Sequence, residues 1–190
     1  NENYLAGKVL GDSVSEIAWR RLREKAGVTY GAYAYNSTRP GGASALMVGG
    51  LFQNNAAEFA ISTYLDLVEK ASTGDIDPSI VATAKWSKGR ETVLAQQSSN
   101  QMANYLVGAV SSGKGLDYLS SIATNLSSVD IDQMSALVAP CKGHEIFTII
   151  GPLQYASDAL ESLGLTYEVV DWDDLHQAQL DENELKKHLK

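Results

Sequence analysis

The chain of 190 residues is 44% hydrophobic, which is enough for one sizeable core, but no stretch is long enough to span a membrane. Its net charge of −8 and pI of about 4.8 argue against nucleic acid as a partner, because phosphate binding requires clustered lysine and arginine. The single cysteine, Cys141, excludes an internal disulfide and a zinc cluster built from thiolates. Composition leaves the source compartment open.

The first part of the chain has a helical pattern that ends at a glycine. Residues 1–10 read as helix, and Asp12 or Ser13 is expected to cap a further helical segment. Apolar residues at helical spacing predict one buried stripe: Ile17, Ala18, Leu22 and Ala26. Gly27 is expected to end the helix, because glycine adopts the left-handed conformation without a Cβ clash.

A period of two begins directly after this glycine and predicts a strand. Val28, Tyr30, Ala32 and Ala34 would share one face, with Thr29, Gly31, Tyr33 and Tyr35 on the other. A turn-rich stretch at 36–42 and a second strand at 43–51 predict an antiparallel hairpin. This layout brings Arg23, near the helix end, and Tyr30, early in the strand, toward the same corner.

The remaining elements are mostly helical. Helices are expected at 54–72, from Pro78 onward, and at 98–110, 116–123 and 130–138, followed by a short apolar strand at 146–150. Residues 175–190 read as an amphipathic helix that packs on this domain or on a neighbour. These patterns predict an α+β fold with an antiparallel-containing sheet and helices on one face. The domain would cover residues 1–170, with an acidic and then helical tail at 171–190.

One segment carries a resemblance to a known family. Eleven of its residues follow the family pattern without gaps: Leu10, Gly11, Ser15, Trp19, Arg23, Glu24, Lys25, Gly27, Val28, Thr29 and Tyr30. The segment resembles the C-terminal half-domain of the inverted-zinc-motif peptidases, the group of pitrilysin, insulin-degrading enzyme and mitochondrial processing peptidase. It departs from the pattern at Asp12, Glu16 and Ile17. The resemblance extends over about residues 4 to 165.

The resemblance implies a specific fold and partner. Members of the family open this half-domain with a strand, whereas here the chain begins at Asn1 with a helical pattern, so a pitrilysin-like half-domain lacking its first strand is expected. An edge left unpaired in this way exposes backbone donors and acceptors, which makes a homodimer through that sheet edge possible. The chain would be a fragment or a processed piece, and its main partner would be the N-terminal, zinc-bearing half-domain or subunit.

The zinc motif of the family, His-x-x-Glu-His, is missing from the sequence. None of the three histidines, His144, His176 and His188, has a second histidine four residues away. His144 reads as a strand-end residue, and residues 171–174 with His176 read as a solvated acidic stretch. No metal ligand and no catalytic residue is therefore expected in this chain. Zinc is expected in the partner half, and the chain alone should be inactive.

By the same resemblance, Arg23 and Tyr30 would be the substrate-binding residues of a zinc metalloendopeptidase. Arg23 would donate hydrogen bonds to the carbonyls of a peptide substrate, and the Tyr30 phenol would stabilise the oxyanion on the scissile bond. Without the resemblance, the two would be an ordinary surface arginine and a packed strand tyrosine. A catalytically inactive structural relative and a peptide-binding domain that works by strand addition are the alternatives.

Overall fold

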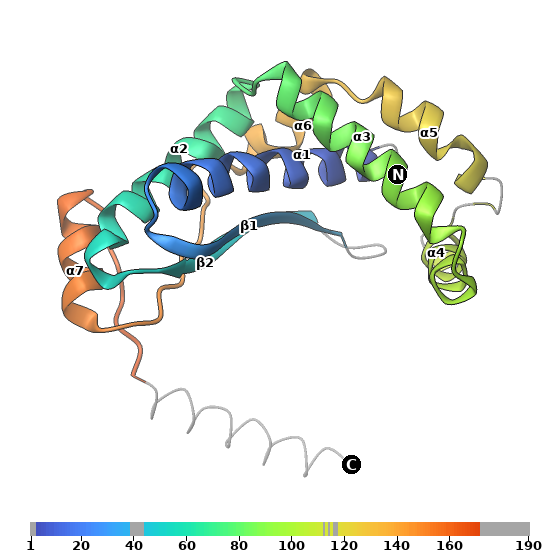
Figure 1. Ribbon diagram of the computed structural model, residues 1–190. Helices are drawn as coiled ribbons and strands as arrows, with labels where there is room; N and C mark the ends of the chain where they lie inside the picture. Colours follow the sequence, from blue (N-terminus) through green and yellow to red (C-terminus); the bar gives the residue numbers. More distant parts are fainter. Residues whose placement is uncertain (1–2, 39–43, 112, 114, 116–117, 172–190) are drawn as a thin grey trace, which may run out of the picture.

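The computed structural model describes residues 3–38, 44–111, 113, 115 and 118–171 (Figure 1). The chain begins with α1 (Asn3–Ala18), which continues into a π-helical segment, η1 (Trp19–Lys25). The predicted helix cap at Asp12 or Ser13 is wrong, because both residues lie inside α1 and Ser13 is fully buried. The apolar residues Val9, Leu10 and Val14 extend the buried face of α1 past this point, so tertiary packing outweighs the local capping signal.

Two strands form the sheet in the part of the chain that the structure describes. β1 (Thr29–Thr38) pairs antiparallel with β2 (Ser44–Phe52), and Tyr33 lies opposite Gly49 in the register. Ala32 and Ala34 share one face of the strand as predicted, and both are buried. The α+β class and the antiparallel hairpin are therefore confirmed.

Helix α1 lies directly on one face of the hairpin (Figure 1). Two glycines one helical turn apart, Gly7 and Gly11, face β1. A Cβ atom added at Gly11 would lie 2.8 Å from the backbone nitrogen of Asn36 and 2.9 Å from the Cα of Tyr35. Only a residue without a side chain allows the helix to approach the strand this closely.

The other helices follow the predicted order: η2 (Asn54–Ala56), α2 (Ala57–Thr73), α3 (Pro78–Ala95), α4 (Ser99–Ser111), α5 (Tyr118–Ser128), α6 (Ile131–Val138), η3 (Ala139–Cys141) and α7 (Leu153–Ser162). Pro78 takes the first position of α3, and the Asp77 side chain caps that helix by accepting from the Ser79 N–H at 2.8 Å. Asp130 and Gln133 form a capping box at the start of α6. None of the described helices combines the length and the apolar character needed to cross a bilayer.

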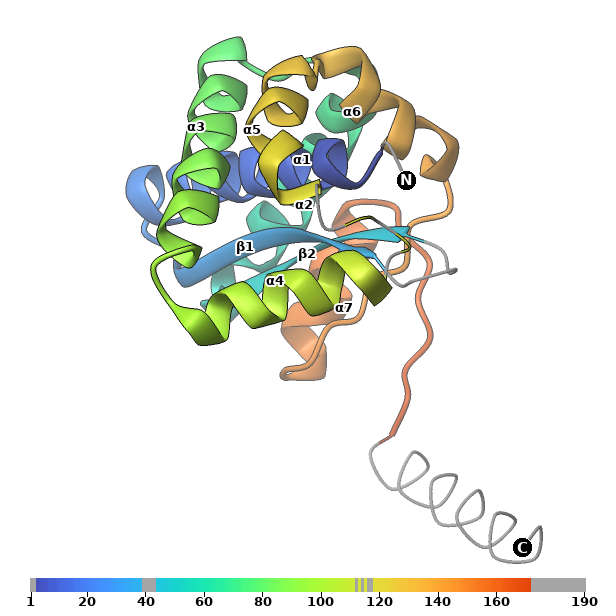
Figure 2. The same ribbon diagram turned by 90° about the vertical axis from the view of Figure 1, so that its right-hand side faces the viewer.

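The core lies between α1, the hairpin and the helices above them. It contains fully buried residues from α1, η1, α2 and α6, among them Val9, Leu22, Leu67 and Met134. A smaller cluster of Ile61, Ala159 and Leu160 fixes α7 against α2. None of the described helices lies on the opposite face of the hairpin, which is flanked by α4 at one end and α7 at the other (Figures 1 and 2).

Three further expectations differ from the structure. Residues 146–150 are not part of the sheet, and α7 follows them without having been predicted. Ala26 is exposed rather than part of the buried stripe, because the π-helical turns of η1 change the spacing at the helix end. The predicted tail helix at 175–190 lies outside the described residues.

Candidate functional site

The turn between η1 and β1 positions the two residues that the sequence brings together. The N–H of Val28 donates to the carbonyl of Leu22 at 3.0 Å, and the N–H of Gly27 donates to Arg23 at 3.2 Å. Gly27 has a φ of 65°, so it ends the helix in the left-handed conformation as predicted. These two hydrogen bonds place the last turn of η1 directly beside the start of β1.

Strand β1 starts with a β-bulge at Tyr30. Thr29 pairs with Phe52 and Gly31 pairs with Leu51, so Tyr30 is the extra residue without a partner in the register. The Thr29 hydroxyl stabilises this shape by accepting from the Gly31 N–H at 3.0 Å and donating to the carbonyl of Leu51 across the hairpin. Bulges of this kind redirect a side chain away from the regular alternation.

The bulge corrects the predicted face of Tyr30. Instead of sharing the buried face of Ala32 and Ala34, Tyr30 is 87% exposed, while Thr29 is buried. The guanidinium carbon of Arg23 lies 5.1 Å from the centre of the Tyr30 ring, which is a cation–π contact. The predicted proximity of Arg23 and Tyr30 is therefore present, although Tyr30 reaches it from the solvent side of the strand.

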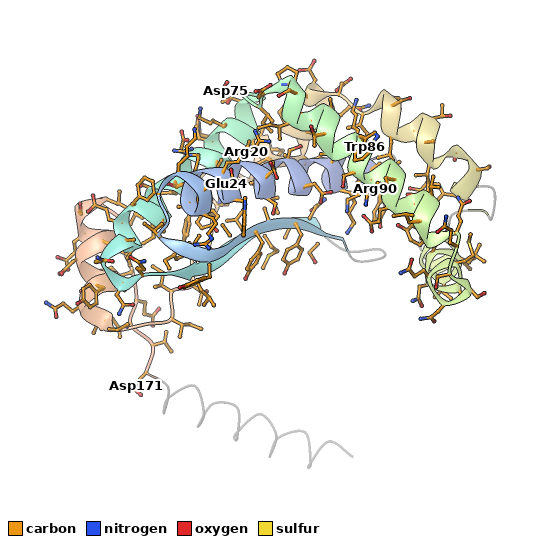
Figure 3. All side chains as sticks on the ribbon, viewed as in Figure 1. Arg20, Glu24, Asp75, Trp86, Arg90 and Asp171 are labelled. Carbon is orange, nitrogen blue, oxygen red and sulfur yellow. The ribbon has the colours of Figure 1, made fainter. Side chains whose placement is uncertain are left out.

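Arg23 differs in its ionic contacts from the two arginines that precede it in the chain. Arg20 pairs with Glu16 at 2.7 Å, and Arg21 pairs with Asp66 on α2. Within the described residues, Arg23 has no carboxylate at ion-pair distance. Figure 3 shows Arg20 and Glu24 on this helix end, together with side chains that project from the helix-free face of the hairpin. Because its charge has no acidic partner in the described chain, Arg23 can donate to a bound ligand.

Large uncharged side chains cover the helix-free face of the hairpin. We call Tyr33, Tyr35, Met47 and Leu51 the outer face. Tyr35 lies opposite Met47, the rings of Tyr33 and Tyr35 stack with centroids 6.4 Å apart, and Leu51 is 82% exposed. The outer face adjoins the bulge, since Leu51 pairs with Gly31. An apolar surface of this kind beside an unpaired arginine is suited to binding a peptide.

On the side of the hairpin that faces the core, a buried tyrosine of α2 holds β2 in place. The Tyr64 hydroxyl on α2 donates to the carbonyl of Gly49, and its ring packs edge-on against Phe52 with centroids 5.8 Å apart. Burial raises the pKa of the Tyr64 phenol well above its usual value. This contact anchors β2 directly behind Tyr33, which lies opposite Gly49.

A separate surface cleft of about 870 Å³ lies between η1, α2 and the start of α3. Its acidic and basic side chains largely pair with each other, as Arg21 does with Asp66 and Lys70 does with Asp75 at 3.2 Å. Neither Arg23 nor Tyr30 lines it. Lys25 also lines the cleft, and it forms no ion pair with a described residue.

The described residues do not fit a zinc site. Among residues 3–38, 44–111, 113, 115 and 118–171, no three side chains of the ligand types come together to hold a metal ion. His144 is exposed and precedes a segment that is not in the sheet, so it does not end a strand as predicted. His176, His188 and residues 172–174 lie outside the described part of the chain.

Comparisons with known proteins do not identify the chain: no family model matches it, and neither does any curated protein. The assignment of a site therefore depends on the geometry alone. The strand alternation already placed Tyr33 and Tyr35 together, but Met47 and Leu51 could be added only once the register was known. No sequence signal marked the bulge, because threonine is an ordinary strand residue.

Proposed function

We propose that this chain is the substrate-binding, non-zinc half of a zinc metalloendopeptidase, which closes the chamber and contacts the scissile peptide. The observation that carries the proposal is the contact of Arg23 with the exposed Tyr30 ring at 5.1 Å. The bulge that exposes Tyr30 and the lack of an acidic partner for Arg23 in the described chain add support.

In this proposal Arg23 binds the peptide backbone. Its planar guanidinium carries several N–H donors, and peptide carbonyl oxygens are suitable acceptors. Contact with the Tyr30 ring restricts the rotamers of the arginine before a ligand arrives, so less conformational entropy is lost on binding. Arg23 thereby orients the substrate.

Tyr30 acts on the reacting bond. Its phenol would donate a hydrogen bond to the oxygen of the scissile carbonyl as negative charge develops on it. Removal of one such donor typically costs about 3 kcal/mol of transition-state stabilisation, which is on the order of a hundredfold in rate. The bulge keeps the Tyr30 side chain clear of the sheet, so that the hydroxyl can reach a ligand.

The outer face would hold the side chains of the same peptide. Tyr33, Tyr35, Met47 and Leu51 are uncharged, so they favour a substrate with aliphatic or aromatic residues near the scissile bond. The phenol hydroxyls of the tyrosines can also donate hydrogen bonds to the peptide.

Zinc would be held by the partner half, where it would activate the attacking water. The residues of this chain bind and orient the peptide and stabilise charge, and they activate no water themselves. The isolated chain should therefore show no peptidase activity.

The test is cleavage of a quenched-fluorescence peptide library by this chain mixed with candidate subunits that carry His-x-x-Glu-His. We expect zinc-dependent cleavage with kcat reduced on the order of a hundredfold in Tyr30→Phe. Arg23→Ala should mainly raise KM. Tyr155→Phe on α7 and Arg20→Ala are matched controls, because each removes the same chemical group from an exposed residue outside the proposed site, and both should cleave at nearly the original rate.

Two results would reject the proposal. Equal activity of Tyr30→Phe and the unmodified chain would remove the oxyanion role of the phenol. If no zinc-bearing subunit gives cleavage, while the chain assembles stably with another protein, the structural relative becomes the better explanation.

A further inference from the structure

The connection between η3 and α7 contains an exposed apolar segment, Ile146 to Ile150, which the function proposed above does not use. It forms part of the orange connection that leads to α7 in Figure 1. Ile146 is 93% exposed and Ile150 is 96% exposed, whereas Phe147 and Ile149 are 38% and 40% exposed. This alternation is the period of an extended strand with one face turned outward.

The backbone of this segment has no partner in the described chain. None of the N–H and C=O groups of residues 146–150 forms a backbone hydrogen bond with a described residue. The nearest such bonds are donated by the His144 N–H before the segment and by the Tyr155 N–H after it. All five side chains of the segment are β-branched or aromatic, and none is charged. Such sequences favour sheets. An exposed, uncharged strand with free backbone groups is a template for pairing with another strand.

We propose that residues 146–150 pair antiparallel with the same segment of a second copy of this chain, centred on Thr148. In this register Ile146 lies opposite Ile150 of the other copy, and Phe147 lies opposite Ile149. Pairs of aliphatic and aromatic side chains across strands are stabilising. The two-fold symmetry closes the assembly at a dimer along this edge of the strand.

The charges beside the segment are compatible with self-pairing. Its nearest charged neighbour, Glu145, falls opposite Gly151 of the other copy, so the antiparallel register brings no like charges together. In a parallel arrangement, by contrast, Glu145 would face Glu145. The interface contains neither Arg23 nor Tyr30, and it is independent of the proposed peptidase function.

The test is sedimentation equilibrium of the full chain and of two double variants at the same positions. The wild type should show a monomer–dimer equilibrium. Ile146→Lys/Ile150→Lys places lysine opposite lysine twice and should raise Kd at least about tenfold. Ile146→Glu/Ile150→Lys places opposite charges together and should dimerise at least about tenfold more tightly than the double-lysine variant.

Both positions are almost fully exposed, so these variants should fold, and circular dichroism checks this. Val107→Lys/Val110→Lys on α4 is the matched control, because it likewise exchanges two exposed β-branched aliphatic residues for lysines, and its Kd should stay within about twofold of the wild type. Hydrogen exchange should show protection at 146–150 that increases with protein concentration.

Three outcomes would overturn the proposal. The first is a monomer at every accessible concentration, which would leave the segment to a strand from another protein. The second is a dimer whose Kd is the same in the wild type and in both double variants, which would place the interface elsewhere on the chain. The third is disruption by the Glu/Lys pair as strong as that by the two lysines, since this identifies parallel pairing.

Discussion

The two faces of the β1–β2 hairpin differ in the size of their side chains. The inner face presents Ala32 and Ala34 to α1, where Gly11 allows the helix to approach the strand backbone. The outer face presents Tyr33, Tyr35 and other large uncharged side chains to solvent. One short hairpin therefore combines a tightly packed surface with an open one.

This difference separates residues that stabilise the fold from residues that are available for binding. Small inner residues are required because α1 leaves no space for larger ones. Large outer residues are not required for packing, since no helix of the described residues covers them. Substitutions on the inner face should therefore change the free energy of unfolding, and those on the outer face should change binding.

The largest effect is expected from a comparison of two leucines, Leu22 of η1 in the core and Leu51 of β2 on the outer face. Leu22 is fully buried and Leu51 is 82% exposed. Leu22→Ala should lower the free energy of unfolding by about 3 kcal/mol, because it leaves a cavity in the core. Leu51→Ala should change it by less than about 0.5 kcal/mol. Urea denaturation measures both, and equal losses would contradict the distinction between the packed core and the outer face.

A pair of glycines provides the next largest contrast. Gly11→Ala would push a methyl group against the backbone of β1, which should cost about 2 kcal/mol after the gain in helix propensity is included. At Gly31 an added Cβ meets no atom within 4 Å, so Gly31→Ala should be nearly neutral. Thermal unfolding of the two variants compares them, and a neutral Gly11→Ala would show that α1 can shift away from the strand.

The bulge can be tested by removing one hydroxyl. Thr29→Val loses the hydrogen bonds to Gly31 and Leu51, and we expect a loss of about 1 kcal/mol of stability. The Tyr30 ring should also leave Arg23, which NMR would detect as a loss of the ring-current shift on the arginine side chain. Thr29→Ser keeps the hydroxyl and serves as control; if it behaves like valine, the hydroxyl does not determine the bulge.

The smallest expected change in the free energy of unfolding comes from the ionisation of Tyr64 at high pH. Because burial raises its pKa in the folded state, the phenol of the unfolded chain loses its proton first, near pH 10. Stability is therefore retained below pH 10 and falls as the pH rises, by about 1 kcal/mol at pH 11. Tyr64→Phe should remove this part of the pH dependence in urea titrations, whereas Tyr30→Phe, at a ring that is 87% exposed, should leave the contribution of Tyr64 in place.

Predictions from the sequence were most accurate where a single residue decides the local conformation. Gly27 ends the helix, Pro78 begins α3, and a helix forms within residues 130–138 as expected. Each of these signals acts within one helical turn, so it can be recognised without knowledge of the fold. The proximity of Arg23 and Tyr30 followed from the short connection between a helix and a strand.

Predictions failed where the partner of a residue is distant in the sequence. The cap at Asp12 or Ser13 was wrong because residues of the core continue the buried face of α1. The strand at 146–150 was wrong because its pattern specifies an extended chain but no neighbour to pair with. The face of Tyr30 was wrong because the bulge depends on a bond from Thr29 to Leu51 on the other strand.

The sequence by itself determined the α+β class, the hairpin and the ends of several helices, since periodicity and capping are local properties of the chain. Only the tertiary structure decided which side of β1 exposes Tyr30, how closely α1 approaches the sheet, and which charges remain unpaired. These features depend on contacts between segments far apart in the chain, and the energy of such contacts is set by three-dimensional packing rather than by local pattern.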